Sequence, residues 1–136
     1  MKRLIAFAAA IAIASPALAH DLGFAGLFSK SNTEDLPELT IAADKPLGED
    51  WTLKSGTYYE VEIEADGSAE LQLDGAEFFR AIWIDEIVIN DMEVRPMALH
   101  SLEFDDEGTV EIGFIAIKPG SYVLKTQSSQ ITVKIQ

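Results

Sequence analysis

Alternation between apolar and polar residues is clearest at the end of the chain. From Thr109 to Gln136 the sequence alternates, turns at residues 118–121, alternates again, and turns at residues 127–130 before a last strand. A period of two places successive side chains on opposite faces of a strand. The apolar face of the last strand is predicted to consist of Ile131, Val133 and Ile135. The apolar phase shifts at Ile115 and Ile117, which predicts either a bulge or burial on both faces.

The same pattern occurs earlier in the chain. Residues 58–64 alternate apolar residues with glutamates, and the Ala65–Ser68 turn predicts a hairpin with residues 70–73. Residues 77–90 are strongly apolar, and their β-branched and aromatic content favours two strand segments over a helix. Further short strands are predicted at residues 39–42, 51–53 and 99–104.

Short strands separated by turn signals about every 8–12 residues are typical of an antiparallel sandwich. We therefore predict an all-β fold, an antiparallel Greek-key β-sandwich that spans residues 36–136. The sequence contains no repeats and no linker, so one domain is expected.

The N-terminal segment has the features of a secretory signal. Lys2 and Arg3 precede an apolar run at residues 4–15, and Ala17-Leu18-Ala19 offers a small-residue cleavage site. The apolar run is too short for a good transmembrane helix. We predict that residues 1–19 are removed, that the mature chain begins at His20 with no membrane anchor, and that it is periplasmic or secreted. Residues 20–35 are then expected to form an irregular N-terminal arm.

Charge and cysteine content exclude several functions. The chain has 23 acidic against 10 basic residues, a formal net charge of −13. Such a surface argues against binding to nucleic acid, which requires clustered lysine and arginine. The sequence contains no cysteine, so disulfides, thiolate nucleophiles and copper centres that use a cysteine sulfur are excluded.

Several segments resemble the cupredoxin family. They are LKSGTYYEVEIEADGSAEL, EFFRAIWI, LHSLEFDDEGTVEIGFIAIKPGSY with its PG-x-Y pattern, and the closing ITVKI. The resemblance covers about residues 39–135 and implies a cupredoxin-like sandwich. It also implies where copper ligands would stand, because a cysteine follows the PG-x-Y tyrosine in copper-bearing members. Here Thr126 stands near that position, no histidine lies near Phe79 and Arg80, and the ligand loop is shortened. The resemblance therefore supports the fold and not a type-1 copper site.

Copper binding of another kind remains an open hypothesis. After cleavage, His20 would offer both an imidazole and an α-amine, and His100 is the one other histidine. Three such nitrogens suit copper. A variant uses Met92, Met97 and His100, which are soft ligands for Cu(I). The simpler interpretations are a histidine at a strand edge and methionines packed under a loop.

The remaining sequence offers little catalytic chemistry. Acidic residues cluster at residues 85–93 and 105–107, but without EF-hand spacing, and solvated turns explain them better than a cation site. No Ser/His/Asp motif, phosphate loop or metalloprotease motif occurs. The sequence thus predicts an exported, non-enzymatic binding or accessory module that lacks a blue-copper site and has a protein partner in the cell envelope. The alternative is a copper-handling protein that uses His20 with His100 or with Met92 and Met97.

Overall fold

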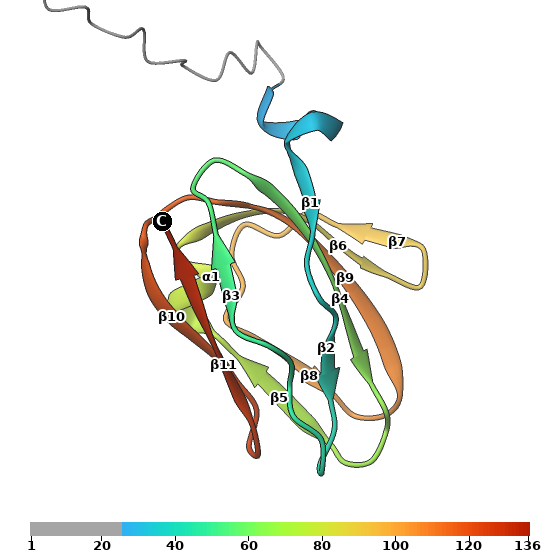
Figure 1. Ribbon diagram of the computed structural model, residues 1–136. Helices are drawn as coiled ribbons and strands as arrows, with labels where there is room; N and C mark the ends of the chain where they lie inside the picture. Colours follow the sequence, from blue (N-terminus) through green and yellow to red (C-terminus); the bar gives the residue numbers. More distant parts are fainter. Residues whose placement is uncertain (1–25) are drawn as a thin grey trace, which may run out of the picture.

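The computed structural model describes residues 26–136, which fold into two facing β-sheets (Figure 1). The predicted β-sandwich is confirmed, although both sheets are mixed and not purely antiparallel. No helix within residues 26–136 is long and apolar enough to cross a membrane.

The first sheet, sheet A, has six strands. Its order is β1-β4-β9-β6-β7, and β2 also pairs with β4. These strands are β1 (Thr33–Asp35), β2 (Leu39–Ile41), β4 (Tyr58–Ala65), β6 (Ile82–Ile89), β7 (Met92–Val94) and β9 (Gly108–Ala116). Strands β1 and β2 both run parallel to β4, one after the other along the same edge, whereas the remaining pairs are antiparallel.

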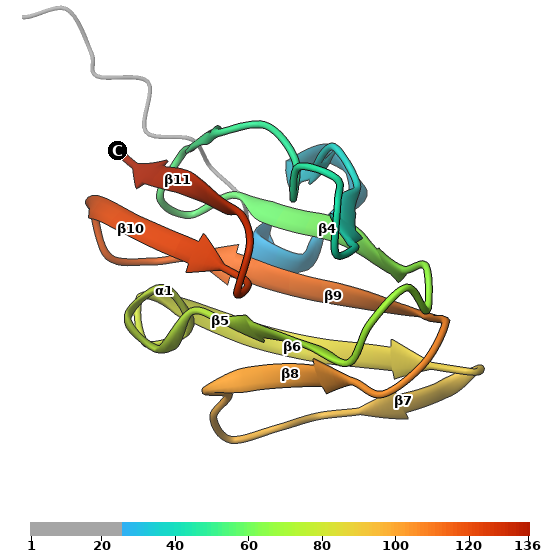
Figure 2. The ribbon, with the colours of Figure 1, turned by 90° about the horizontal axis from the view of Figure 1, so that it is seen from below.

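The second sheet, sheet B, has five strands in the order β3-β11-β10-β5-β8. They are β3 (Trp51–Leu53), β5 (Leu71–Asp74), β8 (Ser101–Phe104), β10 (Gly120–Lys125) and β11 (Gln130–Ile135). The view in Figure 2 shows β10 and β11 side by side, in agreement with their six-residue antiparallel register. Strand β3 runs parallel to β11 at the edge of the sheet.

The core lies between the two sheets and follows the predicted alternation. Strand β11 alternates strictly, so that Ile131, Val133 and Ile135 are buried while the residues between them are exposed. Strand β9 shows burial on both faces: Phe114 belongs to the core, and its neighbour Ile115 is completely buried on the opposite face. The bulge occurs on the facing strand β6, between Ile84 and Glu86.

The predicted hairpin between residues 58–64 and 70–73 is wrong. Strand β4 pairs with β9, β1 and β2, whereas β5 lies in sheet B between β10 and β8. The Ala65–Ser68 turn therefore leads from one sheet to the other. Ser68 accepts a hydrogen bond from the Ala43 amide at 2.9 Å, and Asp66 pairs with Lys45 at 2.9 Å, so the crossing is fastened to the β2–β3 connection.

Residues 77–90 also differ from the prediction of two strands. They begin in the short helix α1 (Ala76–Phe79), and β6 is the one strand that follows. Phe78 and Phe79 are both buried although they are adjacent, an arrangement that a helical turn at the sandwich mouth permits and an alternating strand with one solvated face does not. Phe78 packs edge-to-face on Phe114 and on Trp51, which joins the helix to both sheets.

The N-terminal arm was expected to be irregular, and its described part is ordered. It contains 3-10 helices at Gly26–Phe28 and Lys30–Asn32, followed by β1, which pairs with β4. The signal peptide, its cleavage after Ala19 and His20 lie outside the described residues.

Candidate functional site

The turn between β10 and β11 takes the place that the resemblance assigns to a copper-ligand loop. The Thr126 amide donates to the Ser129 carbonyl at 2.8 Å, which closes the connection. The Ser129 hydroxyl accepts from the Leu47 amide at 2.9 Å and so ties the turn to the β2–β3 connection. At the other end of β10, in the β9–β10 connection, Tyr122 of the PG-x-Y pattern donates its hydroxyl to the Lys118 carbonyl at 2.8 Å. Hydroxyls and backbone groups hold the β10–β11 turn together, and none of its residues is a cysteine, histidine or methionine.

The predicted soft metal ligands lie on and beside β7. Met92 is in β7 and 58% exposed, and Met97 is fully exposed in the β7–β8 connection. His100 is exposed just before β8, where its Nδ1 lies 3.3 Å from the Ser101 hydroxyl. The interpretation of methionines packed under a loop does not hold for these two side chains, which face solvent. The copper hypothesis itself stays a prediction, because His20 is outside the described residues.

The arm covers the outer face of sheet A with a small aromatic cluster. The Phe28 ring packs edge-to-face against Tyr58, with ring centroids 6.1 Å apart, and against Trp83 at 6.4 Å. Ile115 pairs with both Tyr58 and Trp83 across the sheet, and it is completely buried beneath them. Tyr58 is buried as well, whereas Trp83 remains 59% exposed. The cluster is therefore closed on the Tyr58 side and open on the Trp83 side.

Asn32 anchors the arm to the sandwich. Its side-chain amide donates to the Leu27 carbonyl at 3.0 Å and to the Gly56 carbonyl at 2.9 Å. Asn32 is the only buried polar residue in the described part of the chain. Because buried amides are costly unless they are hydrogen-bonded, this pair of bonds fixes where the arm crosses the sheet. The position of Phe28 on Trp83 depends on this anchor.

A polar cluster stands beside the aromatic one, at the bulge of β6. The Arg95 guanidinium meets Asp85 at 2.8 Å, Glu86 at 3.0 Å and Glu93 at 3.3 Å. The Tyr58 hydroxyl donates to Asp85 at 3.1 Å. Burial, together with the nearby charge of Asp85, raises the pKa of the Tyr58 phenol, so the phenol remains a donor. The single Arg95 cation thus pairs with three carboxylates, and the cluster has an excess of negative charge.

Glycine is required where the Tyr58 ring crosses the sheet. The ring lies directly over Gly113 of β9, and a side-chain carbon at this position would collide with the phenol oxygen. This close approach brings the hydroxyl to Asp85. Gly113 therefore links the aromatic cluster to the polar one.

A hollow beside β6 completes the site. We call it the β6-edge groove, and it is lined by Phe79, Ile82, Trp83, Ile84, Pro96, Met97 and Ala98. One wall is the first half of β6, and the other is the chain that leaves β7. All lining residues are apolar, and the two large exposed ones, Trp83 and Met97, stand at its rim. Large exposed apolar groups gathered around a hollow are the usual mark of an interaction site.

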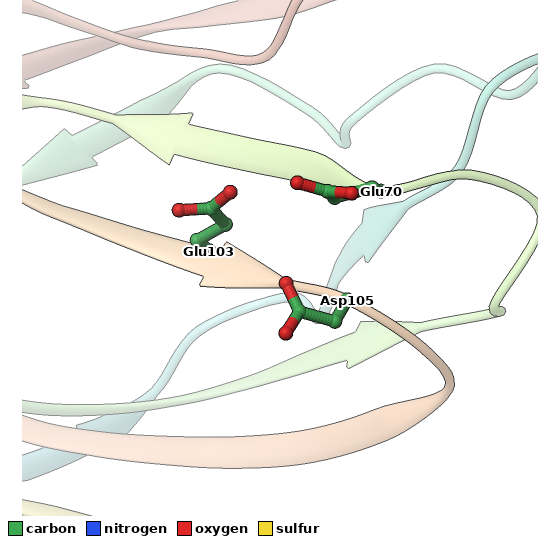
Figure 3. Close-up of side chains that lie close together, drawn as sticks. All are labelled: Glu70, Glu103 and Asp105. Atoms are coloured by element: carbon green, nitrogen blue, oxygen red, sulfur yellow. The ribbon is translucent and has the colours of Figure 1, made fainter.

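Three carboxylates lie close together on sheet B, where β5 begins and β8 ends. Glu70, Glu103 and Asp105 each have a carboxylate oxygen within 4.8 Å of the others, and all three are exposed (Figure 3). A hydrogen bond with Glu70 and the charge of that group raise the pKa of Glu103. In the described part of the chain no histidine joins such a group, so His100 has no carboxylate cluster beside it. We interpret this acidic cluster as crowded surface charge.

The fold is cupredoxin-like, in agreement with the sequence resemblance. The multi-copper oxidase from Pseudomonas thermotolerans aligns with a TM-score of 0.52 and 14% identity, over 79% of this chain and 31% of that one. The laccase from Botrytis aclada aligns with a TM-score of 0.46 and 12% identity, over 68% of this chain and 20% of that one. Auracyanin A, a "blue" copper protein from Chloroflexus aurantiacus, aligns with a TM-score of 0.44 and 13% identity, over 76% of this chain and 99% of that one.

These similarities define the fold alone. The chain spans about a third of the length of the multi-copper oxidase. No protein-family model and no curated protein matches the sequence. A type-1 copper site requires a cysteine thiolate, and the chain contains no cysteine to provide it.

Sequence reasoning did not single out Trp83. It lies within an apolar run and was grouped with residues of core character. A signal in the sequence for the open edge beside Trp83 is Arg95-Pro96, because proline cannot donate to a strand ladder and the pairing of β7 with β6 stops just before it, at Val94.

Proposed function

We propose that the protein is an exported, non-enzymatic binding module that uses the Trp83 side of sheet A to bind a protein partner in the cell envelope. The observation that supports this function is that large apolar side chains are exposed to solvent at the β6-edge groove. Trp83 is 59% exposed and Met97 fully exposed. Burying apolar area contributes about 25 cal/mol per Å², so covering both side chains would add favourable free energy to the binding of a partner.

The chemistry at the groove favours binding over catalysis. Its lining has no titratable side chain. Among the side chains of residues 26–136, the His100 imidazole has one hydrogen-bond partner, the Ser101 hydroxyl. Among the described residues no carboxylate is hydrogen-bonded to the imidazole to orient it as a general base. A role without chemistry is therefore the better supported proposal.

Export rests on the N-terminal sequence. A positively charged start, a short apolar run and the Ala17-Leu18-Ala19 site together favour secretion and cleavage. The intact mass of the exported protein tests this step. A mass that begins at His20 supports the proposal, and a mass that retains residues 1–19 contradicts it.

Photo-crosslinking in the exporting cell tests the binding function. A photo-reactive benzoyl-phenylalanine replaces Trp83 in one variant and Val123 in a matched control, since Val123 is 41% exposed on sheet B. The proposal expects a discrete crosslinked product from position 83 and none from position 123. If neither position gives a discrete product, the module has no partner at this surface.

Copper handling is a second candidate, and the exposure of two of the predicted soft ligands favours it. Met92 and Met97 face solvent, so their thioethers are accessible to Cu(I). In the other version, the α-amine and imidazole of His20 hold Cu(II) together with His100. Both versions predict a weakly coloured or colourless centre, because no thiolate exists to give an intense blue band.

Competition titration with Cu(I) and Cu(II) separates the two versions. Adding one residue before His20 should abolish Cu(II) binding in the nitrogen version and leave the melting temperature of the metal-free protein unchanged. Met97→Leu should abolish Cu(I) binding in the methionine version. If neither ion binds more tightly than about 1 µM, or roughly −8 kcal/mol, the copper candidate is rejected.

A further inference from the structure

The first half of β6 has an edge that no strand among residues 26–136 pairs with. Strand β7 pairs only with Ile87–Ile89, whereas β9 pairs with β6 along its whole length. Continuing the β6–β7 register would place Pro96 opposite Asp85 and Met97 opposite Ile84. Proline has no amide hydrogen, and the β6 bulge falls at the same point, so the ladder ends there. The edge of Ile82–Ile84 is left beside the β6-edge groove.

The two sides of this edge differ in character. Alternation directs Ile82 and Ile84 toward the sandwich interior, on the side of the buried Phe79, while the exposed Met97 lies at the rim of the groove. Trp83 points the other way, onto the outer face of sheet A. A strand added at this edge would thus place alternate side chains in the groove and the others beside Trp83.

The outer face beside Trp83 is strongly acidic. Arg95 is shared by Asp85, Glu86 and Glu93, which leaves an excess of two negative charges at the bulge. Glu60 stands in the next row of the sheet, and its pKa is raised by burial and then by the charges of Glu111, Asp35 and Glu86. The protein as a whole carries a formal charge of −13. A second copy of the chain would be repelled, and a basic segment would be attracted.

We propose that the first half of β6 accepts an extended polypeptide segment of a partner as an added strand, and that this segment alternates apolar with basic residues. This inference rests on the binding function proposed above and names the chemistry of the partner. Backbone groups of the segment bond to the free edge at Ile82–Ile84. Its apolar side chains enter the β6-edge groove. Its lysine or arginine side chains lie on the outer face, over the Trp83 ring and toward Glu86.

A peptide titration tests this inference, with binding detected by the amide chemical shifts of the ¹⁵N-labelled mature protein. The probe is the capped peptide Lys-Val-Lys-Val-Lys-Val. One control replaces lysine by glutamate, and a second carries N-methyl groups that remove the amide donors. The inference expects saturable binding of the probe with shifts centred on residues 82–84 and on residues 97 and 98. Both controls should bind about tenfold more weakly or worse.

Variants of the protein locate the interaction. Trp83→Lys and Met97→Lys should each weaken the probe about tenfold, because they add positive charge and remove apolar contact. Val123→Lys makes the same charge change on sheet B and should alter affinity by less than about twofold. Met97 is fully exposed, so its substitution keeps the test valid even if Trp83→Lys fails to fold.

Several outcomes overturn the inference. Equal binding of the N-methylated peptide would replace strand addition by simple apolar contact. Shifts away from residues 82–84, or no binding at all, would reject the edge as the site. A dimer of the protein that competes with the probe would assign the groove to a second copy, and tighter peptide binding after removal of residues 20–25 would assign it to the chain's own N-terminal segment. A crosslink from position 83 without peptide binding would leave the binding function standing and reject strand addition.

Discussion

Asn32 offers the sharpest test of how the arm is held on the sandwich. Its amide donates to two carbonyl oxygens, those of Leu27 and Gly56, from a position that is 8% exposed. Asn32→Ala removes both bonds. Asn32→Asp keeps the shape of the side chain but, when ionised, turns a double donor into an acceptor that faces two carbonyl oxygens. The two substitutions therefore separate loss of hydrogen bonds from electrostatic repulsion.

The magnitudes follow from the two bonds. A hydrogen bond contributes a net of about 0.5–1.5 kcal/mol, so Asn32→Ala is expected to cost about 1–3 kcal/mol. Asn32→Asp should cost more at pH 7, because a buried carboxylate without a donor is more expensive than a small cavity. The cost to global unfolding would be limited to what the arm contributes if the substitution detaches the arm and leaves the sandwich folded.

Two measurements distinguish local from global effects. Urea melts followed by far-UV circular dichroism report the global free energy of unfolding. The emission of Trp83, measured in a Trp51→Phe background, reports whether Phe28 still covers the ring, and detachment should shift this emission to longer wavelength. The pKa of the introduced carboxyl should be raised in the folded state. Its penalty should therefore be absent at acid pH and grow as pH rises through that raised pKa.

The reasoning is refuted if Asn32→Asp is as stable as the wild-type protein at pH 7, or more stable than Asn32→Ala. Either result would mean that the amide does not donate to both carbonyls. Ser31→Ala, at an exposed neighbouring position, serves as the control and should change stability by about 0.5 kcal/mol or less.

Three further predictions concern the sandwich itself. Val133→Asp should cost several kcal/mol because Val133 is completely buried, whereas Lys134→Asp on the exposed face should cost about 0.5 kcal/mol or less, and equal thermal melts would contradict the register. Glu103→Gln should raise the melting temperature at neutral pH and lose this advantage in acid. Glu70 raises the pKa of Glu103, so the charged form of Glu103 destabilises the fold as pH rises through this raised pKa. A difference in melting temperature that does not depend on pH would contradict this account. Trp51→Phe should change stability by less than about 1 kcal/mol in urea melts, since the buried indole nitrogen of Trp51 has no hydrogen-bond partner among residues 26–136 and its removal offsets the lost contact; a loss of several kcal/mol would indicate a bond to that nitrogen.

The strands of the sandwich could be predicted from the sequence because their evidence is local. Residues 130–135 alternate strictly, and one solvated face beside one buried face is enough to fix both the strand and its register. The evidence that decides which sheet each strand joins is not local. The Asp66-Gly67 turn looks the same whether the chain folds back on itself or crosses to the other layer, and the anchors that decide it, Ala43 and Lys45, lie more than 20 residues away in the sequence.

The candidate site was predicted only in part, for a related reason. Phe78 and Trp83 stand in one apolar run, yet Phe78 is 2% exposed and Trp83 is 59% exposed. What separates them is where β7 stops pairing and where the arm ends, and both depend on distant residues. Met97 and His100 were singled out for their chemistry. The structure gives Met97 a place at the rim of an apolar groove and leaves the metal hypothesis to experiment.

The short strands β1 and β2 have a consequence for stoichiometry. They occupy the edge of sheet A opposite to β6 and β7, each is three residues long, and β2 is also bonded on its far side, where the Thr40 amide donates to the Leu47 carbonyl at 2.8 Å. Short and partly covered edges resist further pairing. Sheet A can then be extended from one side only. A complex formed by strand addition should stop at one segment per protein molecule, instead of propagating into chains of like molecules.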